Sequence, residues 1–406
     1  MRTQELLSRR RVAWAYLGLA LLAALAVACT DDSITGVDEV QVPDPAAEEL
    51  RVWDGLGVTV MTWNVYVGAD LESVLGAAPK DIPLAVAQAF QTVVANNFPE
   101  RAEAIARQVA RFRPHLIGLQ EVSKIYIQSP GDAIGGGTIP AEAIFLDYLD
   151  TLQVKLEARG LDYRVAGQVR NFNVEMPMYT GNDPIPFDDV RLEDWEVVLA
   201  RGDVEVSRVL EKNFMAQVPD PVPGIPFPCG YVALDARIGW KSYRFVSTHL
   251  QALWVPDLVL VQLGQAQELT ALLEDEKLPV IVVGDFNSQA AGGEEYERQT
   301  YQFMLGAGYV DTWTRNINPF EGNGLTNAES YFDLTDPTRV FDQRIDFIFA
   351  RNNIPFLDEP AIGPVVATVV GDAQRDRTRS GLWPSDHAGI VARLYLPRVR
   401  RFTRRW

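Results

Sequence analysis

Three short motifs in the last third of the chain place polar, chemically capable side chains at the ends of apolar, strand-like runs. They are Gly284-Asp285-Phe286-Asn287, Arg344-Ile345-Asp346-Phe347 and Ser385-Asp386-His387. Carboxylates, an amide and an imidazole are costly to bury in a structural core. Together they are typical of phosphate-ester hydrolysis with a hard metal ion, because the ion neutralises the anionic substrate and orients the phosphoryl oxygen.

Three earlier motifs have the same character: Met61-Thr62-Trp63-Asn64-Val65, Gly118-Leu119-Gln120-Glu121-Val122 and Ser247-Thr248-His249-Leu250. In this order the motifs resemble the endonuclease/exonuclease/phosphatase superfamily. That group includes pancreatic deoxyribonuclease, abasic-site endonucleases, inositol-polyphosphate phosphatases and neutral sphingomyelinases. Each motif alone is weakly specific, but the whole series, spanning residues 61–387, is a strong indication. The resemblance implies a metal-dependent phosphoesterase.

The metal ligands are expected among carboxylate and amide oxygens, which Mg²⁺ prefers while it keeps several waters. Glu121 is the best ligand candidate, with Asn64 beside it. Asn64 either binds the metal or donates a hydrogen bond to the carboxylate that orients the attacking water. By resemblance, Asp386 contacts the metal or a second ion. The expected cofactor is Mg²⁺, with Mn²⁺ as the alternative.

Asp285 and Asn287 lie two residues apart, so on an extended strand their side chains point the same way. Asp285 can then orient or deprotonate water while Asn287 holds the phosphate or that water. The alternative is a simple Asx turn at a strand end. The apolar run before Gly284 favours the catalytic interpretation, because a glycine there permits close approach to the site.

The chain has three histidines, and two of them fall in the motifs. By resemblance, His387 pairs with Asp346, which sets its tautomer, raises its pKa and lets it clamp the phosphate. Whether His387 or Asp285 takes the proton of water stays open. His249 resembles a phosphate-oxygen donor or leaving-group helper. His115 is interpreted as structural.

The walls of the site are harder to assign. The resemblance implies a phosphate-contacting tyrosine, with Tyr163 and Tyr179 as candidates, while Tyr66 stands where abasic-site endonucleases carry Asp. The segments Asn171–Arg191 and Asn213–Gly230 are rich in Pro, Asp and aromatics. We expect them to be irregular and to contact substrate.

The elements that position these residues alternate between strands and helices. The resemblance implies an α/β fold, a four-layer αββα sandwich of two mixed, mostly antiparallel sheets flanked by helices. Apolar runs predict the strands and 3.6-residue periodicity predicts the helices. The expected strands are Val58–Val65, His115–Val122, Tyr163–Ala166, Val197–Ala200, Tyr231–Arg237, Tyr243–Thr248, Val280–Val283, Ile345–Ala350 and Gly389–Leu396. The expected helices are Glu100–Phe112, Ala141–Arg159, Leu258–Leu272 and Glu294–Leu305.

The N-terminal segment is typical of protein export. Basic residues precede an apolar run from Val12 to Ala28, which ends in a sequence resembling a bacterial lipobox. We expect Cys29 to be lipidated, with a plain secretion signal or a retained anchor helix as alternatives. The protein would then be exported and anchored in the bacterial cell envelope, facing the periplasm or the exterior. The expected organisation is a signal peptide at 1–28, an acidic linker at 29–51, the folded domain at 52–397 and a basic tail at 398–406.

The net charge of the chain limits which substrates are expected. The 406 residues carry a net charge of −17, which repels polyanions. Small organophosphates and phospholipid headgroups therefore rank above DNA, and nucleic acid is a partner only as substrate. An extracellular nuclease is the alternative function, followed by a catalytically inactive binding protein on the same fold. The expected oligomeric state is a monomer.

An apolar segment, Leu253-Trp254-Val255-Pro256, follows His249 closely. It resembles the sphingomyelinase branch, where an exposed apolar loop could meet a bilayer. The alternative is ordinary core packing, which we favour.

Overall fold

The computed structural model describes residues 57–181, 186–218, 228–328, 333–353 and 360–397. The predictions placed on residues 1–51, Cys29 included, and on the tail at 398–406 lie outside these ranges. Within them, no helix combines the length and the apolar character needed to cross a membrane.

The larger sheet has eight strands. Its order is β13-β14-β1-β2-β6-β3-β4, with β5 paired to β6. The β1–β2 pair is parallel, and the other pairs are antiparallel. The strands are β1 (Val58–Asn64), β2 (Leu116–Gln120), β3 (Lys124–Gln128), β4 (Ala143–Asp147), β5 (Tyr163–Tyr179), β6 (Phe187–Arg201), β13 (Val365–Val370) and β14 (Gly389–Leu394).

The smaller sheet has six strands in the order β11-β12-β10-β9-β8-β7. Here β9 and β10 are parallel, and the remaining pairs are antiparallel. The strands are β7 (Glu205–Asn213), β8 (Gly230–Ile238), β9 (Lys241–His249), β10 (Val280–Asp285), β11 (Val310–Asp311) and β12 (Asp346–Arg351).

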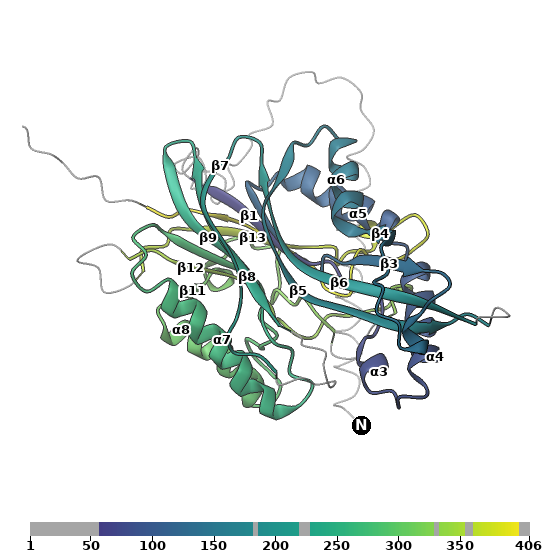
Figure 1. Cartoon of the computed structure of the whole chain (residues 1–406). Coiled ribbons are helices and arrows are strands. Elements are labelled where there is room, and N and C mark those ends of the chain that lie inside the picture. The colour runs from purple at the N-terminus through teal and green to yellow at the C-terminus, as the bar shows by residue number, and fades with distance from the viewer. Residues whose placement is uncertain (1–56, 182–185, 219–227, 329–332, 354–359, 398–406) are drawn as a thin grey trace, which may run out of the picture. The chain divides into compact units, whose positions relative to one another are not determined.

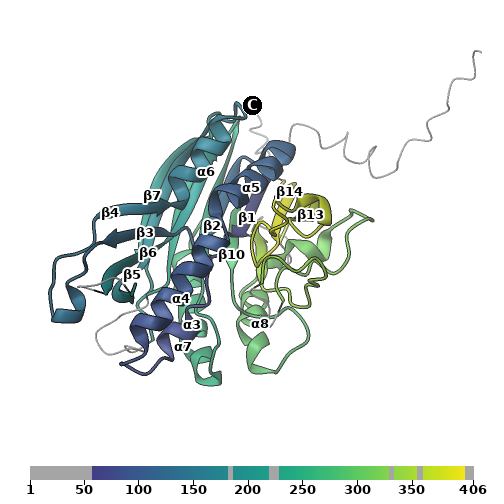
Figure 2. The ribbon, with the colours of Figure 1, turned by 90° about the vertical axis from the view of Figure 1, so that its right-hand side faces the viewer.

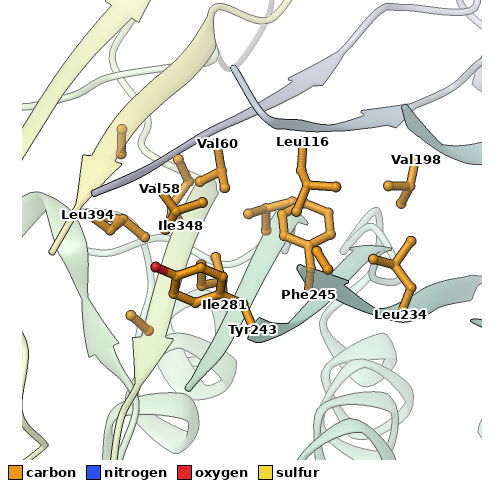
Figure 3. Packing of buried hydrophobic residues seen from close by; sticks show 14 of the residues in the cluster. Val58, Val60, Leu116, Val198, Leu234, Tyr243, Phe245, Ile281, Ile348 and Leu394 are labelled. Carbon is orange, nitrogen blue, oxygen red and sulfur yellow. The ribbon is translucent and has the colours of Figure 1, made fainter. Parts of the chain in front are cut away.

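The two sheets pack face to face over a shared apolar core (Figure 3). Val60 and Leu116 of the larger sheet meet Phe245 and Ile281 of the smaller one, and all four are buried. Burying each such side chain contributes about 1.5–3 kcal/mol. At Gly118 the sheets come so close that an added Cβ would lie 2.4 Å from the Ser247 hydroxyl. This close approach brings the motif-bearing strand ends of both sheets together.

Helices cover the outer face of each sheet (Figures 1 and 2). The apolar stripe of α5 (Phe98–Phe112) and the buried side of α6 (Tyr148–Glu157) pack on the larger sheet. On the smaller sheet lie α7 (Val259–Leu272) and α8 (Gln299–Gly306). The layers therefore run helix, sheet, sheet, helix, which confirms the predicted αββα sandwich.

Several parts of the secondary structure differ from the predictions, and the strands β3, β7, β11 and β13 were not predicted. The segment Ala141–Arg159 is not one helix, because Ala143–Asp147 pairs with β3 as strand β4 and the helix begins at Tyr148. The segment Asn171–Arg191 is not irregular, since its described parts belong to the long β5–β6 hairpin. The helices α3 (Glu72–Leu75) and α4 (Ile82–Ala95) were not predicted, and α4 packs against β5 (Figure 1).

Candidate active site

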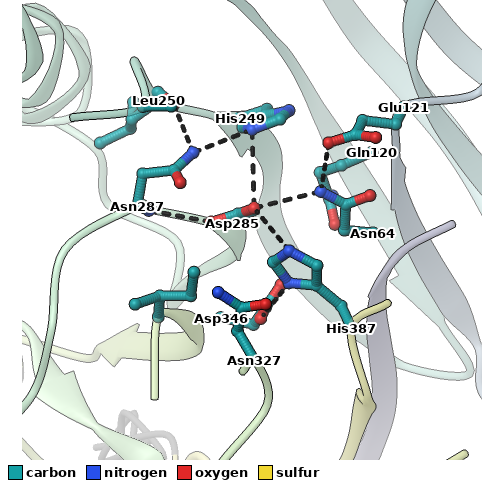
Figure 4. A network of polar contacts seen from close by, with 12 residues as sticks. Asn64, Gln120, Glu121, His249, Leu250, Asp285, Asn287, Asn327, Asp346 and His387 are labelled. Carbon is teal, nitrogen blue, oxygen red and sulfur yellow. Dashed lines mark hydrogen bonds and ion pairs between the residues drawn. The ribbon is translucent and has the colours of Figure 1, made fainter. Parts of the chain in front are cut away.

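Strand ends from both sheets bring the predicted residues to one place (Figure 4). The parallel pairing sets Asn64 beside Gln120 and His249 beside Asp285, and antiparallel pairing sets Asp285 beside Asp346. One continuous network of hydrogen bonds and ion pairs then links the following residues: Asn64, Glu121, His249, Asp285, Asn287, Asp346 and His387.

Asn64 is fully buried and bridges the two central carboxylates. Its Nδ2 donates to Glu121 Oε1 at 2.8 Å and to Asp285 Oδ2 at 3.1 Å. Its Oδ1 accepts from the Tyr66 backbone N–H at 3.0 Å. Asn64 therefore makes the hydrogen bond that the sequence left open as its second possible role. The same bridge ties the larger sheet to the smaller one at the site.

The Glu121 carboxylate is held in a fixed orientation at the end of β2. Its Oε1 accepts from Asn64, and its Oε2 accepts from the Val67 backbone N–H at 2.8 Å. The backbone of Glu121 is left-handed, with φ at 58°, and the same holds for Tyr66 at 62° and Asn287 at 48°. Such conformations cost roughly 1–3 kcal/mol each and persist where the surroundings impose them, most often at functional sites.

Gly284 allows the two parallel strands of the smaller sheet to meet at the site. Its φ is 147°, and an added Cβ would lie 1.8 Å from the Thr248 carbonyl oxygen. A side chain there would push β10 away from β9. The glycine therefore keeps Asp285 next to His249.

Asp285 is the hub of the network. Its Oδ1 accepts from the Asn287 backbone N–H at 2.9 Å, which is an Asx turn. Its Oδ2 lies 3.5 Å from His249 Nε2 and 3.8 Å from His387 Nε2. The Asx turn and the polar cluster occur together here, so the two interpretations of this motif do not exclude each other.

The Asn287 side chain connects Asp285 to His249. Its Nδ2 donates to the Leu250 carbonyl oxygen and approaches His249 Nε2, both at 3.0 Å. The amide nitrogen is a donor, so His249 Nε2 accepts and the ring proton sits on Nδ1. That Nδ1 lies 3.8 Å from Glu196 Oε1.

His387 forms the expected pair with Asp346. The His387 Nδ1 is 2.9 Å from Asp346 Oδ2, and both residues are buried. Burial lowers the pKa of His387, but the charges of Asp346 and Asp285 outweigh it and raise that pKa well above 6.5. Burial raises the pKa of Asp346. The pair fixes the His387 ring with Nε2 facing Asp285.

The donor atoms of Asp285, Asp346 and His387 lie within 4.8 Å of one another, close enough for a metal cluster. The short bond between His387 and Asp346 already occupies one atom of each residue. These three residues are therefore less available to a metal ion than the carboxylates on the Glu121 side of the network.

Asp386 borders a cleft beside this network. The cleft has a volume of about 600 Å³, its open mouth included, and it is also lined by Glu121, Asp194, Tyr66 and His249. Burial raises the pKa of Asp386 to about 6, and the Glu121 charge adds to this while the His387 charge opposes it. None of the described residues lining the cleft is Lys or Arg.

The donor set of this cleft fits a divalent cation. The carboxylates of Glu121, Asp386 and Asp194 face one space, and its described lining includes no Lys or Arg to neutralise them. Oxygen donors of this kind suit Mg²⁺ or Mn²⁺. Glu121 and Asp386 would hold the ion, with the Asn64 amide orienting the Glu121 carboxylate.

Three buried polar residues on the β5–β6 hairpin were not predicted. The Asn171 Nδ2 donates to Asp194 Oδ2 at 2.9 Å and to Glu196 Oε1 at 3.3 Å. Burial raises the pKa of Asp194 to about 6, with the Glu121 charge adding to it, and burial also raises the pKa of Glu196. The signal was present as the two-residue spacing of Asp194 and Glu196 on one strand face.

The tyrosine prediction was wrong. The Tyr163 hydroxyl donates to the Pro114 carbonyl oxygen in the core, and Tyr179 packs against Phe187 at the far end of the hairpin. The tyrosine that lines the cleft is Tyr66.

Two other residues have structural roles. Asp70 accepts from the backbone N–H groups of Glu72 and Ser73 at the start of α3. The Nδ1 of His115 accepts from the Thr59 backbone N–H at 3.0 Å, away from the cleft, which agrees with the structural interpretation of this histidine. Burial, together with the Arg201 charge, lowers the pKa of His115 to about 4.

The apolar segment after His249 does not pack in the core. Trp254 is 40% exposed and Val255 is 47% exposed. The core-packing interpretation that we favoured is therefore wrong for these two residues.

A buried arginine holds the loops that carry the site. Arg101 of α5 is fully buried and donates to the carbonyl oxygens of Val65, Tyr66 and Pro384. These carbonyls belong to the loops after Asn64 and before Asp386. One helix side chain therefore fixes both loops against each other.

Comparisons with known proteins agree with this arrangement. The family model of the endonuclease/exonuclease/phosphatase family matches residues 61–387. No curated protein matched the chain in a sequence search.

Solved structures with a similar fold share little sequence with this chain. An endonuclease/exonuclease/phosphatase from Beutenbergia cavernae is 21% identical with a TM-score of 0.49, covering 84% of this chain and 72% of its own. Truncated TDP2 of Caenorhabditis elegans is 16% identical with a TM-score of 0.44, and the match covers 84% of this chain and 98% of the TDP2 chain. The Bacteroides thetaiotaomicron mannosyl-6-phosphatase is 15% identical with a TM-score of 0.45, and the match covers 83% of this chain and 99% of the phosphatase chain. Similarities this distant carry no argument about substrate.

The family match covers nearly all of the described domain, and its bounds begin at the first motif and end at His387. The chain belongs to the endonuclease/exonuclease/phosphatase family.

Proposed function

We propose that this protein is a divalent-metal-dependent phosphoesterase that cleaves a phosphate ester by attack of activated water. Members of its family are hydrolases that act on phosphoesters. The observation that carries the proposal is the single polar network joining Glu121, Asp285 and His387 from three separate parts of the chain. A structural core gains nothing from burying these groups together.

Each group in the network has a role that follows from its contacts. The metal ion, when bound at Glu121 and Asp386, neutralises the phosphate and polarises its oxygens. Asp285 orients the attacking water and accepts its proton, because Asn64 and Asn287 hold its two oxygens in place. His387, oriented by Asp346, donates from Nε2 to the charge that develops on the phosphate.

His249 and Asn287 form the other side of the site. The contact between Asn287 Nδ2 and His249 Nε2 places both groups beside Asp285. In the proposed complex the Asn287 amide binds a phosphate oxygen, and His249 assists the leaving group. The contact from the Asn287 amide to His249 Nε2 favours the tautomer with the ring proton on Nδ1, the side that faces Glu196.

We further propose that the substrate is a small organophosphate or a phospholipid headgroup rather than DNA. The described residues of the cleft lining include no Lys or Arg that would bind a polyanion backbone. The net charge of −17 acts in the same direction. A nuclease remains the second candidate, favoured by the family membership itself.

The setting of the enzyme is also a proposal. The apolar run that ends at Cys29 supports export and lipid anchoring in a bacterial envelope, with the acidic segment that follows as a tether. A monomer is sufficient for this chemistry, because every residue of the network comes from one chain.

The test is hydrolysis of bis(p-nitrophenyl) phosphate by the purified protein with Mg²⁺ or Mn²⁺. We expect turnover that a chelator abolishes and that His387→Ala lowers by about 10²–10⁴-fold in kcat/KM. The matched control is His115→Asn, which replaces a histidine remote from the cleft and should keep full activity. Unchanged turnover in His387→Ala would overturn the proposed role of that residue.

A substrate panel separates the two candidate functions. Phosphatidylinositol, sphingomyelin, inositol phosphates and plasmid DNA are compared at equal phosphorus concentration and fixed salt. We expect the highest kcat/KM among the phospholipid and small-molecule substrates. A preference for plasmid DNA would favour the nuclease.

A further inference from the structure

An apolar pocket adjoins the catalytic cleft. It lies between the helices α3 and α4 and the β5–β6 hairpin. Its volume is about 670 Å³ when the open mouth is included and about 80 Å³ for the cavity itself. Every lining residue is apolar, and among them are Ala89, Phe90, Phe172, Met176, Val190 and Leu192.

The pocket and the cleft share part of their walls. Val67, Ala69, Leu71 and Phe172 line both. The backbone N–H of Val67 also donates to the carboxylate of Glu121, the expected metal ligand, at 2.8 Å. A molecule bound at the metal therefore meets the apolar wall directly.

One face of strand β6 changes from apolar to acidic along its length. Val190 and Leu192 line the pocket. The next two residues on the same face are acidic. Asp194 lines the cleft, and Glu196 approaches His249. Residues two apart on a strand share a face. At about 3.3 Å per residue, Val190 and Asp194 lie roughly 13 Å apart along the strand. The surface suits a ligand with a charged end and an apolar end.

The pocket is unsuited to water and is poorly explained as a packing defect. Its lining has no polar side chain, and a buried water needs two to four polar partners. Several of its walls, such as Leu71, Phe90 and Met176, stay only partly buried. Leaving these side chains partly exposed forgoes the stability that their full burial would contribute.

We propose that this pocket binds the hydrocarbon chain of the substrate, so that the enzyme acts on phosphate esters of long-chain alcohols or glycerides. The proposal rests on the phosphoesterase function and names its substrate class. Glu121 and Asp386 would hold the phosphate through the metal ion, and the hydrocarbon chain would run from the shared wall at Phe172 along β6 toward Val190.

The test uses alkyl p-nitrophenyl phosphodiesters with methyl, butyl and octyl chains, below their micelle concentrations, with the full-length protein. Each buried methylene contributes up to about fourfold in affinity. We expect kcat/KM to rise about two- to fourfold per methylene until the pocket is filled. If the methyl ester is cleaved but kcat/KM does not change with chain length, the pocket proposal is overturned and the phosphoesterase function stands.

Three variants locate the effect. Ala89→Phe fills the pocket and should flatten the rise of kcat/KM with chain length. Ala95→Phe makes the same change on the exposed side of α4 and should keep the rise. Val190→Thr changes polarity without changing volume and should lower octyl-ester turnover about tenfold, so the test survives if Ala89→Phe fails to fold.

A binding measurement separates this proposal from the catalytic one. Calorimetric titration of dodecylphosphonate and methylphosphonate into the Mg²⁺-loaded protein should show much tighter binding of the long chain, and Ala89→Phe should remove the difference. If no ester is cleaved but this difference is present, the phosphoesterase function fails and the pocket stands.

Two other occupants would overturn the proposal. The first is a membrane. If both phosphonates bind equally well and Ala89→Phe weakens binding of the protein to phosphatidylcholine vesicles, the pocket is a membrane contact. A change of oligomeric state in Ala89→Phe by analytical ultracentrifugation would identify a second copy of the chain as the occupant.

Discussion

Replacing Asp346 by Asn should impair catalysis while leaving the fold nearly intact. Asp346 is fully buried, and its Oδ2 accepts the 2.9 Å hydrogen bond that orients His387. Asn is nearly isosteric but carries no charge, and its NH₂ group would lie where one of the two oxygens now sits. A buried hydrogen bond to a charged group contributes about 1.5–3 kcal/mol. At 1.36 kcal/mol per factor of ten, its loss lowers kcat/KM by roughly 10- to 150-fold.

The assay compares Asp346→Asn with the original protein on bis(p-nitrophenyl) phosphate, together with thermal unfolding. The loss should fall on kcat rather than KM, because the oriented His387 acts on charge that develops in the transition state. The control is Asp376→Asn, a buried carboxylate that accepts from Gln108 at 2.7 Å away from the cleft. That variant should lose stability without losing kcat. A change in kcat below threefold in Asp346→Asn would refute the positioning role.

Three further perturbations test other parts of the structure. Gly284→Ala should lower the free energy of unfolding, measured by urea denaturation, by more than about 2 kcal/mol, because Gly284 has a left-handed φ and lies against Thr248. A smaller loss would contradict the close approach of β9 and β10. His115 has a pKa near 4 when folded, lowered by burial and by Arg201, against about 6.5 unfolded. The stability that neutral His115 contributes is therefore present above pH 6.5 and is lost as the pH falls toward 4, by up to about 3 kcal/mol. The difference in unfolding free energy between the original protein and His115→Asn should shrink over that pH range. Cys29→Ala should release the protein from membranes into the soluble fraction upon fractionation, and continued membrane association would contradict lipid anchoring.

The sequence predicted for a physical reason which polar residues would lie together at the strand ends. Buried parallel and central strands appear as continuous apolar runs, so a polar residue directly after such a run marks a strand end. Asp285 after Val280–Val283 and Asn64 after β1 are examples. The four-layer arrangement followed from the family resemblance, not from these patterns alone.

The β5–β6 hairpin was missed because its stability comes from tertiary pairing rather than from local pattern. Its apolar residues Phe172, Val174 and Met176 alternate on one face, but Pro and Asp residues interrupt the segment. Strand propensity depends strongly on the neighbouring strand. Strand β4 was assigned to a helix for a related reason, since Ala143–Asp147 is an exposed edge strand with little apolar alternation.

The missed hairpin and the missed helix α4 matter more than their length suggests, because together they enclose the pocket. The motifs come from the strand ends around the candidate active site, and they can be shared by enzymes with different substrates. The pocket depends instead on how α4 packs on β5, a contact between segments more than 70 residues apart in places. No spacing within either segment encodes that contact. Substrate preference in this chain is therefore expected to change with residues such as Ala89 and Val190 while the motifs, and the chemistry they perform, stay the same.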